Sequence, residues 1–467
     1  MFVHQTSETV QKLAPDTTTG PDRNRVISGV RCDDVAATKG TASHLPTTFD
    51  IRGEFAKPNI DDFALAYCYP RHILPSSNNI LVQDDGVLAC LRALGMASFS
   101  LSRRSTEAAV SARSYYLRSL QALSAAVRSP MHATLDNTLL SAMMLSFFET
   151  IIGERRMGLE AWSNHVAGTA ALLHMRGMGQ LRTQDGLTLF LQATTNIMSQ
   201  CVHHCQRLPQ SVRRMIDECT AHIPDPSDPV WKVHTAWAQL VDFLADVVGD
   251  HLRHAVVIET AHKLDAALSL AFVDAGSAWH FEIQKTAPNG ATVRFQGYYH
   301  IYQSSLSAQV WNSMRNGRLV LSDIVIGVAE SGAFGVDADC VISAIATKSQ
   351  MSRDILATVP QHTRCADFAT VPRLSTPVSG VSTLLDHTSA RLPVLRTARG
   401  YQLVWFVASV GSRASVGSEI RVTACEALRT CASALGLQQA AFLAERLERG
   451  AVPGCYNDRS DRSVSPR

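Results

Sequence analysis

The sequence predicts an all-α protein, a large multi-helix domain that follows a flexible N-terminal leader. Apolar residues recur at spacings of three and four over most of residues 81–450, which is the period of an amphipathic helix. Hydrophobic residues make up 46% of the chain and charged residues 18%, a composition typical of a globular protein with a large interior. No internal repeat of fixed period stands out. We therefore expect one large helical assembly.

The predicted domain organisation has three parts. Residues 1–80 are rich in Thr, Ser, Asp, Pro and Gly and lack a sustained apolar period, which predicts a mostly disordered leader. Residues 81–450 carry the helical periodicity and form the predicted domain. Residues 451–467 are polar and predict a tail.

Three helices are predicted in the first part of the domain. Val87 and Leu94 belong to a short apolar pattern that indicates a helix at the domain edge. The second helix opens at Ser105, a residue type that caps helix N-termini, and Pro130 closes it. The third covers residues 139–151 and is apolar nearly all round, so we expect it at the centre of the core.

Three further helices are predicted before residue 250. Residues 160–176 present Trp162 on the apolar side, and Gly177 follows where a left-handed C-cap needs glycine. The next helix spans about residues 187–207. Closely spaced prolines then mark a loop before a helix over residues 237–248.

The last part of the domain is predicted to begin with one long helix over residues 297–329. Its spacing places Trp311 and Leu321 toward the core, and Arg315 and Arg318 toward solvent. The sequence that follows loses the helical period, and then resumes it.

Two features close the domain. A compact apolar run covers residues 401–411, and residues 424–448 predict one or two amphipathic helices.

Charge and targeting signals exclude several classes of protein. The 43 basic and 41 acidic residues leave a net charge of +2, so no global field would draw the chain to nucleic acid or to an anionic membrane. The N-terminus has no apolar segment behind a basic start, which predicts an intracellular protein. Residues 186–206 lack charge but carry many amides and imidazoles, so they predict a soluble helix and no membrane span. The eleven cysteines show no framework spacing, and we expect mostly buried free thiols.

An ordered set of polar and aromatic residues is the most specific feature of the chain. A helix ends on Phe147, Phe148 and Glu149, then a Trp-x-x-His pattern leads into Gly168 and a terminal Arg-Gly pair, and a Trp-Asn pattern with two spaced arginines comes later. These residues resemble the fungal-specific transcription factor domain family, the regulatory domain of fungal Zn2Cys6 transcription factors. The signature residues are Glu149, Trp162, His165, Gly168, Arg176, Gly177, Trp311, Asn312, Arg315 and Arg318.

The resemblance implies a nuclear all-α regulatory domain that modulates activation, mediates dimer or coactivator contacts and can sense metabolites. The signature residues are then structural, with no catalytic, cofactor-binding, metal-binding or DNA-binding role.

Two departures from the family pattern concern DNA recognition. A Zn2Cys6 module needs six thiolates within about thirty residues, because two zinc ions share bridging sulfurs. Before residue 100 the chain has only Cys32, Cys68 and Cys90. The leader also shows no heptads for a coiled-coil linker. We therefore expect DNA contact only indirectly, or through a module that is not present in this chain.

Three local patterns suggest other chemistry, and a structural interpretation is favoured for each. Cys201 and Cys205 flank two histidines at a spacing that suits a metal, but both continue an apolar helix face. Asp61 and Asp62 resemble the start of the magnesium motif of helical terpene cyclases, yet the next expected carboxylate is missing. His165 could act as a base, but its position favours a hydrogen bond across a helix contact.

The leading hypothesis from the sequence is a nuclear transcriptional regulator of a metabolic or secondary-metabolite gene cluster. Its expected partners are other transcription factors or coactivators, with a homodimer or heterodimer left open. No enzymatic activity, cofactor or membrane association is expected. The alternatives are a metabolite-binding helical module without a transcriptional role and, last, a helical enzyme.

Overall fold

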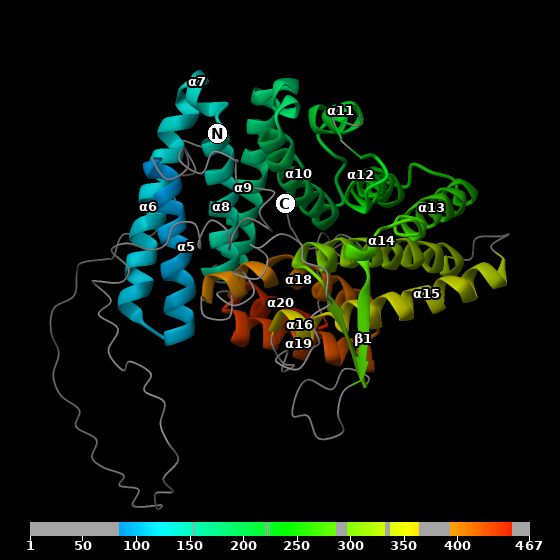
Figure 1. Ribbon diagram of the computed structural model, residues 1–467. Helices are drawn as coiled ribbons and strands as arrows, with labels where there is room; N and C mark the ends of the chain where they lie inside the picture. Colours follow the sequence, from blue (N-terminus) through cyan, green and yellow to red (C-terminus); the bar gives the residue numbers. More distant parts are fainter. Residues whose placement is uncertain are drawn as a thin grey trace, which may run out of the picture. The chain divides into compact units, whose positions relative to one another are not determined.

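The structure, a computed structural model, describes residues 84–152, 155–219, 221, 223, 225–285, 297–331, 337–363 and 393–450. All of them belong to the unit that runs from Ile60 to Arg467. The predicted leader and tail, and the Asp61 and Asp62 pair, lie outside the described residues. Within the described residues the predicted all-α fold is confirmed, with one small sheet in addition (Figure 1).

The first group of helices stands side by side, with α8 packed against α5, α6 and α9 (Figure 1). These helices account for the predicted order of elements up to about residue 204. The elements are α5 (Asp85–Arg103), α6 (Thr106–Arg128), α7 (Pro130–Ala133), α8 (Asp136–Ile152), α9 (Arg155–Arg176), the 3-10 helix η1 (Met178–Arg182) and α10 (Gln184–His204).

Local sequence signals set the ends of α6. The hydroxyl of Ser105 accepts a hydrogen bond from the backbone N–H of Ala108 at 3.2 Å, which satisfies one free donor of the first turn. Pro130 stands in the first turn of α7, where its missing N–H costs no hydrogen bond. Both predicted boundaries are confirmed. The helix before α6 is longer than its apolar pattern indicated, since α5 begins at Asp85 and ends at Arg103.

Helix α8 is the centre of this group. Its residues from Thr138 to Phe148 are all buried, whichever side of the helix they occupy. A helix that is apolar all round must be covered on every side, and α8 has neighbours in α5, α6, α9, α10, α18 and α20. The prediction of a central helix is confirmed.

The second group of helices includes α14, which runs across the first group together with α15 and α18 (Figure 1). Helix α18 packs against both α5 and α14 and therefore joins the two groups. The elements are α11 (Gln210–Cys219), α12 (Pro229–Val248), α13 (His254–Ser269), η3 (Ser277–Trp279), α14 (Ser305–Glu330), α15 (Ala338–Leu356), α16 (Val359–Thr363), α18 (Pro393–Arg413), α19 (Glu419–Leu435) and α20 (Gln438–Glu448).

A two-stranded antiparallel sheet corrects the sequence prediction for residues 297–329. Strands β1 (Phe281–Lys285) and β2 (Tyr298–Tyr302) pair with Phe281 opposite Tyr302. The long helix therefore begins only at Ser305, after Ser304 caps it. In β2 the alternate residues His300 and Tyr302 are buried, a period of two that is typical of a strand and not of the predicted helix.

No helix in the part of the chain that the structure describes has the length and apolar character needed to cross a membrane.

Candidate functional site

A buried polar triad links three helices at the first signature position. Tyr116 on α6 donates its hydroxyl hydrogen bond to Glu149 on α8. The same hydroxyl lies 3.3 Å from Nε2 of His165 on α9. Tyr116 also stacks on Phe148, with ring centroids 4.5 Å apart. The predicted hydrogen bond of His165 across a helix contact is therefore present.

Burial changes the proton affinity of all three triad members. It raises the pKa of Glu149 to about 7, and the hydrogen bond from Tyr116 opposes this shift. Burial lowers the pKa of His165 to about 4, so this imidazole is neutral at physiological pH. The other ring nitrogen, Nδ1, has no hydrogen-bond partner in the described part of the chain. Within the described residues, the contact that His165 makes across the helices is the one to Tyr116.

The second signature position connects the first helix group to α18. Nε1 of Trp162 donates a hydrogen bond to the hydroxyl of Tyr401 at 3.0 Å. The Trp162 ring packs on Trp405 with centroids 4.8 Å apart, and Phe147 packs on Tyr401 at 4.9 Å. The apolar run after residue 400 thus lies directly against the Trp-x-x-His helix, and it forms part of α18.

Arg176 fastens the end of α9 to the segment before α8. Its guanidinium forms an ion pair with Asp136 and donates hydrogen bonds to the Thr134 carbonyl at 2.8 Å and to Gln180 at 3.2 Å. Gly177 follows with φ +60° and ψ −163°, a conformation open essentially to glycine alone. The predicted need for glycine is confirmed, although ψ differs from that of a left-handed cap because the chain turns at once into η1.

Arg315 lies in the opposite environment from the one predicted. Its side chain is buried, with the residue only 1% exposed. Nη1 donates to the hydroxyl of Tyr302 and to Oδ1 of Asn312, the latter at 3.3 Å. The nearest carboxylate is Asp354 on α15, with Oδ2 3.9 Å from Nε of the guanidinium.

Aromatic rings surround this buried cation. The guanidinium carbon lies 5.1 Å from the centroid of Phe281, 5.2 Å from that of Trp311 and 5.7 Å from that of Tyr302, within the range of cation–π attraction. Burial, together with the charge of Arg315, lowers the pKa of the neighbouring His300 to about 3. The rings of Phe281 on β1 and Tyr302 on β2 cover the face of α14 that carries Arg315. The helical period of the sequence gives no indication of this contact.

The remaining residues of this motif make separate contacts. Nδ2 of Asn312 donates to Oγ1 of Thr358 at 2.9 Å, a buried hydrogen bond between α14 and the start of α16. Arg318 is partly exposed and binds Asp265 on α13 through two hydrogen bonds of 2.8 and 3.1 Å. The prediction that both arginines face solvent is therefore wrong for Arg315, whereas Arg318 is partly exposed.

The signature residues are therefore distributed over several helix contacts and do not converge on one reaction centre. Sequence reasoning missed the partners Tyr401, Asp354 and Tyr302, which come from segments far away in the chain. The one available signal was the run of aromatic and polar residues at 298–302, whose alternation is typical of a strand.

The CVHHC segment does not form a metal centre in the described residues. No group of three His, Cys, Asp or Glu side chains there is placed to hold a metal ion. Cys201 is a buried free thiol, as expected, and its sulfur lies 3.7 Å from the Arg207 carbonyl oxygen. Cys205 differs from the expectation, because it is disulfide-bonded.

Comparison with known families identifies one match in the chain. Residues 74–238 match the model of the fungal specific transcription factor domain. Over these residues the chain is similar to that regulatory family. The match includes Glu149, Trp162, His165 and Arg176, whereas the Arg315 motif lies beyond residue 238. Neither the comparison with curated proteins nor that with solved structures found a match.

The structure adds a physical role for the residues within the transcription factor domain. Glu149, His165, Trp162 and Arg176 hold one helix to another through Tyr116, Tyr401 and Asp136.

Proposed function

We propose that this protein is a nuclear transcriptional regulator that controls a metabolic or secondary-metabolite gene cluster in a fungus. The observation that carries the proposal is the transcription factor domain at residues 74–238. The use of its polar signature in helix contacts supports a regulatory rather than a catalytic role. We propose no enzymatic activity, because Tyr116 and His165 are buried and the Tyr116 hydroxyl links His165 to Glu149.

The regulator acts through protein contacts. Its partners are other transcription factors or coactivators, and it reaches DNA indirectly or through a module outside this chain. The near balance of 43 basic and 41 acidic residues supports this, because tight sequence-independent DNA binding needs a field of basic residues along the phosphate backbone.

Transcript levels in a deletion strain test the proposal. We expect deletion of the gene to change the transcripts of a limited set of genes, and reintroduction of the full chain to restore them. Two complementing variants sharpen the result. Arg318→Ala, a partly exposed position, should restore the transcripts, whereas Arg315→Ala, a buried one, should not because the fold is weakened. Unchanged transcripts across the genome after deletion would contradict the proposal. A fluorescent fusion of the full chain should accumulate in the nucleus.

A further inference from the structure

One end of the first helix group carries exposed methionines. Met131 on α7 is 72% exposed, Met175 at the end of α9 is 47% exposed, and Leu135 between α7 and α8 is 46% exposed. Met178 in η1 is half-buried. We call these four residues the methionine surface. Large apolar side chains normally leave water on folding, so a group of them at one end of a domain marks a contact site.

The four residues lie together because Arg176 holds their segments in place. Its hydrogen bond to the Thr134 carbonyl and its ion pair with Asp136 fall on either side of Leu135. Its bond to Gln180 fixes η1 against the end of α9. The exposed side chains thus stand on a rigid base, while methionine itself adapts its shape to a partner.

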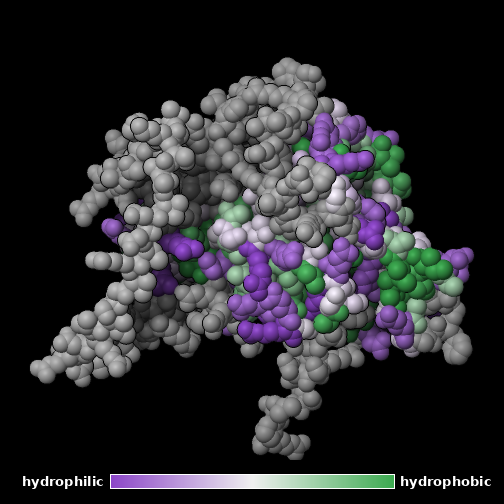
Figure 2. Space-filling view, turned by 90° about the horizontal axis from the view of Figure 1, so that it is seen from below, coloured by the Kyte–Doolittle hydropathy of each residue, from purple (hydrophilic) through white to green (hydrophobic). Residues whose placement is uncertain are grey.

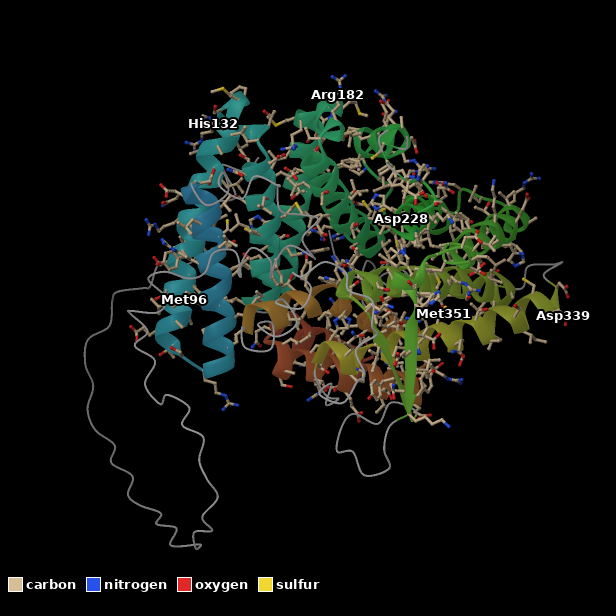
Figure 3. All side chains as sticks on the ribbon, in the orientation of Figure 1. Met96, His132, Arg182, Asp228, Asp339 and Met351 are labelled. Carbon is tan, nitrogen blue, oxygen red and sulfur yellow. The ribbon has the colours of Figure 1, made fainter. Side chains whose placement is uncertain are left out.

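The chain segments that carry the methionine surface are basic and contain no acidic residue. Residues 124–135 and 171–183 contain no Asp or Glu. Arg128 and Arg182 are exposed, as are His132 and His174. Figure 3 shows His132 and Arg182 at the same upper end of the helix group. Two neighbouring carboxylates are already engaged within the fold: Asp136 is paired with Arg176, and Asp84 caps α5 and accepts a hydrogen bond from Asn137.

We propose that the methionine surface binds an acidic amphipathic helix of a partner protein. The apolar side of such a helix covers Met131, Leu135 and Met175, and its carboxylates face Arg128 and Arg182. Charge complementarity selects this occupant over a neutral or basic one. The inference names the chemistry of a partner for the proposed regulator, but it rests only on the exposure and charge of this end of the domain.

Other exposed apolar residues do not share this charge pattern. Figure 2 shows further hydrophobic residues on the face seen from below. On α15, Ile342 is 64% exposed and Ile345 is also exposed, but Asp337 and Asp339 stand at the start of the same helix. An acidic ligand would be repelled there. The two isoleucines therefore provide a matched control.

The test measures binding of a labelled peptide to the full chain by fluorescence anisotropy. The probe is a designed peptide of about 18 residues that forms a helix with Leu and Phe on one side and Glu on the other. We expect saturable binding that weakens as salt is added, because the rim contacts are electrostatic. Met131→Glu with Met175→Glu should lower the affinity at least tenfold. Arg128→Glu with Arg182→Glu should do the same, and Ile342→Glu with Ile345→Glu should leave it unchanged.

Four outcomes would overturn the proposal. The first is equal binding by the methionine variant and the unaltered chain. The second is equal binding of a scrambled peptide with the same composition, which would show attraction by charge alone. The third is tighter binding after Asp61→Lys with Asp62→Lys, which would make the acidic segment of the chain itself the occupant. The fourth is loss of a dimer, in sedimentation, on replacing Met131 and Met175, which would make a second copy the occupant.

The experiments that test the proposed function and the proposed binding surface are independent of each other. Peptide binding is measured on purified protein, so its loss leaves the transcript experiment unaffected. Because the substituted methionines, arginines and isoleucines are exposed, each of these variants should keep the circular dichroism spectrum and melting temperature of the unaltered chain.

Discussion

At the scale of single residues, Arg315 and Arg318 are three positions apart on α14 but lie in different environments. Arg315 is buried among aromatic rings and Tyr302, and Arg318 is partly exposed beside Asp265. We expect Arg315→Ala to lower the free energy of unfolding by about 3 kcal/mol or more, since it empties a buried volume and leaves Tyr302 and Asn312 without their donor. Arg318→Ala should cost less than about 1 kcal/mol. Urea denaturation measures both, and equal losses would contradict the burial of Arg315.

The raised pKa of Glu149 leads to a second prediction for a single residue. Its pKa is raised from 4.5 to about 7, so the folded protein holds a proton that the unfolded chain releases. The carboxyl therefore adds stability at low pH, and this contribution is lost as the pH rises from about 4.5 to 7. Glu149→Gln does not titrate. We expect the stability of Glu149→Gln relative to the unaltered chain to improve by about 2 kcal/mol between pH 5 and pH 8.

Denaturation at the two pH values measures the effect, and Tyr116→Phe is its companion variant. The Tyr116 hydrogen bond lowers the pKa of Glu149, so removal of the hydroxyl should move the pH-dependent range upward. A Glu149→Gln difference that does not vary with pH would exclude the raised pKa.

At the scale of elements, the contact between α9 and α18 joins the matched transcription factor domain to the later part of the chain. Tyr401→Phe removes the acceptor for the buried indole N–H of Trp162 and keeps the ring in place. We expect a loss of about 1–2 kcal/mol in the free energy of unfolding, the cost of a buried donor without a partner. Tyr299→Phe, at a half-buried tyrosine of β2, should change it by less than about 0.5 kcal/mol. Equal effects in urea denaturation would show that the Trp162 bond contributes nothing.

At the scale of the whole molecule, buried neutral histidines make stability depend on pH. Burial lowers the pKa of His165 and His234 to about 4, and burial with the charge of Arg315 lowers that of His300 to about 3. The unfolded chain binds protons at these imidazoles near pH 6.5, whereas the folded chain does not. Acidification from about pH 6.5 to pH 4 should therefore destabilise the fold, by on the order of 3 kcal/mol for each imidazole.

Chemical denaturation across this range checks the sign. Glu149 and Asp354, whose pKa values burial raises, act in the opposite direction, but burial also lowers the pKa of His203, so the imidazoles outnumber the carboxyls and the net slope follows the histidines. His234→Gln, which retains an amide to meet Oγ1 of Thr194, should reduce the slope. Stability that rises on acidification would contradict the neutral state of these histidines.

Features that local interactions determine were predictable from the sequence, whereas features that depend on contacts between distant segments were not. The caps at Ser105 and Pro130 and the glycine after α9 were predictable, because backbone geometry and nearby side chains determine them. The central position of α8 was predictable from its unbroken apolar surface. The β strand at 298–302 and the burial of Arg315 were not, because both depend on contacts with β1 and α15.

By itself the sequence determined the helical class, the order of the long helices up to α12 and the family resemblance of residues 74–238, because periodicity, caps and motif order depend on local residues. The short helices α7 and α11 were not predicted. Only the tertiary structure decided what each signature side chain touches. The partners of Trp162, Arg176 and Arg315 come from other segments of the chain. Because these polar groups are buried, loss of a partner lowers the free energy of unfolding more than it would at the surface. Folding likewise decided that Met131 and Met175 stay exposed at a basic rim, because exposure depends on which neighbours cover a side chain and not on its type.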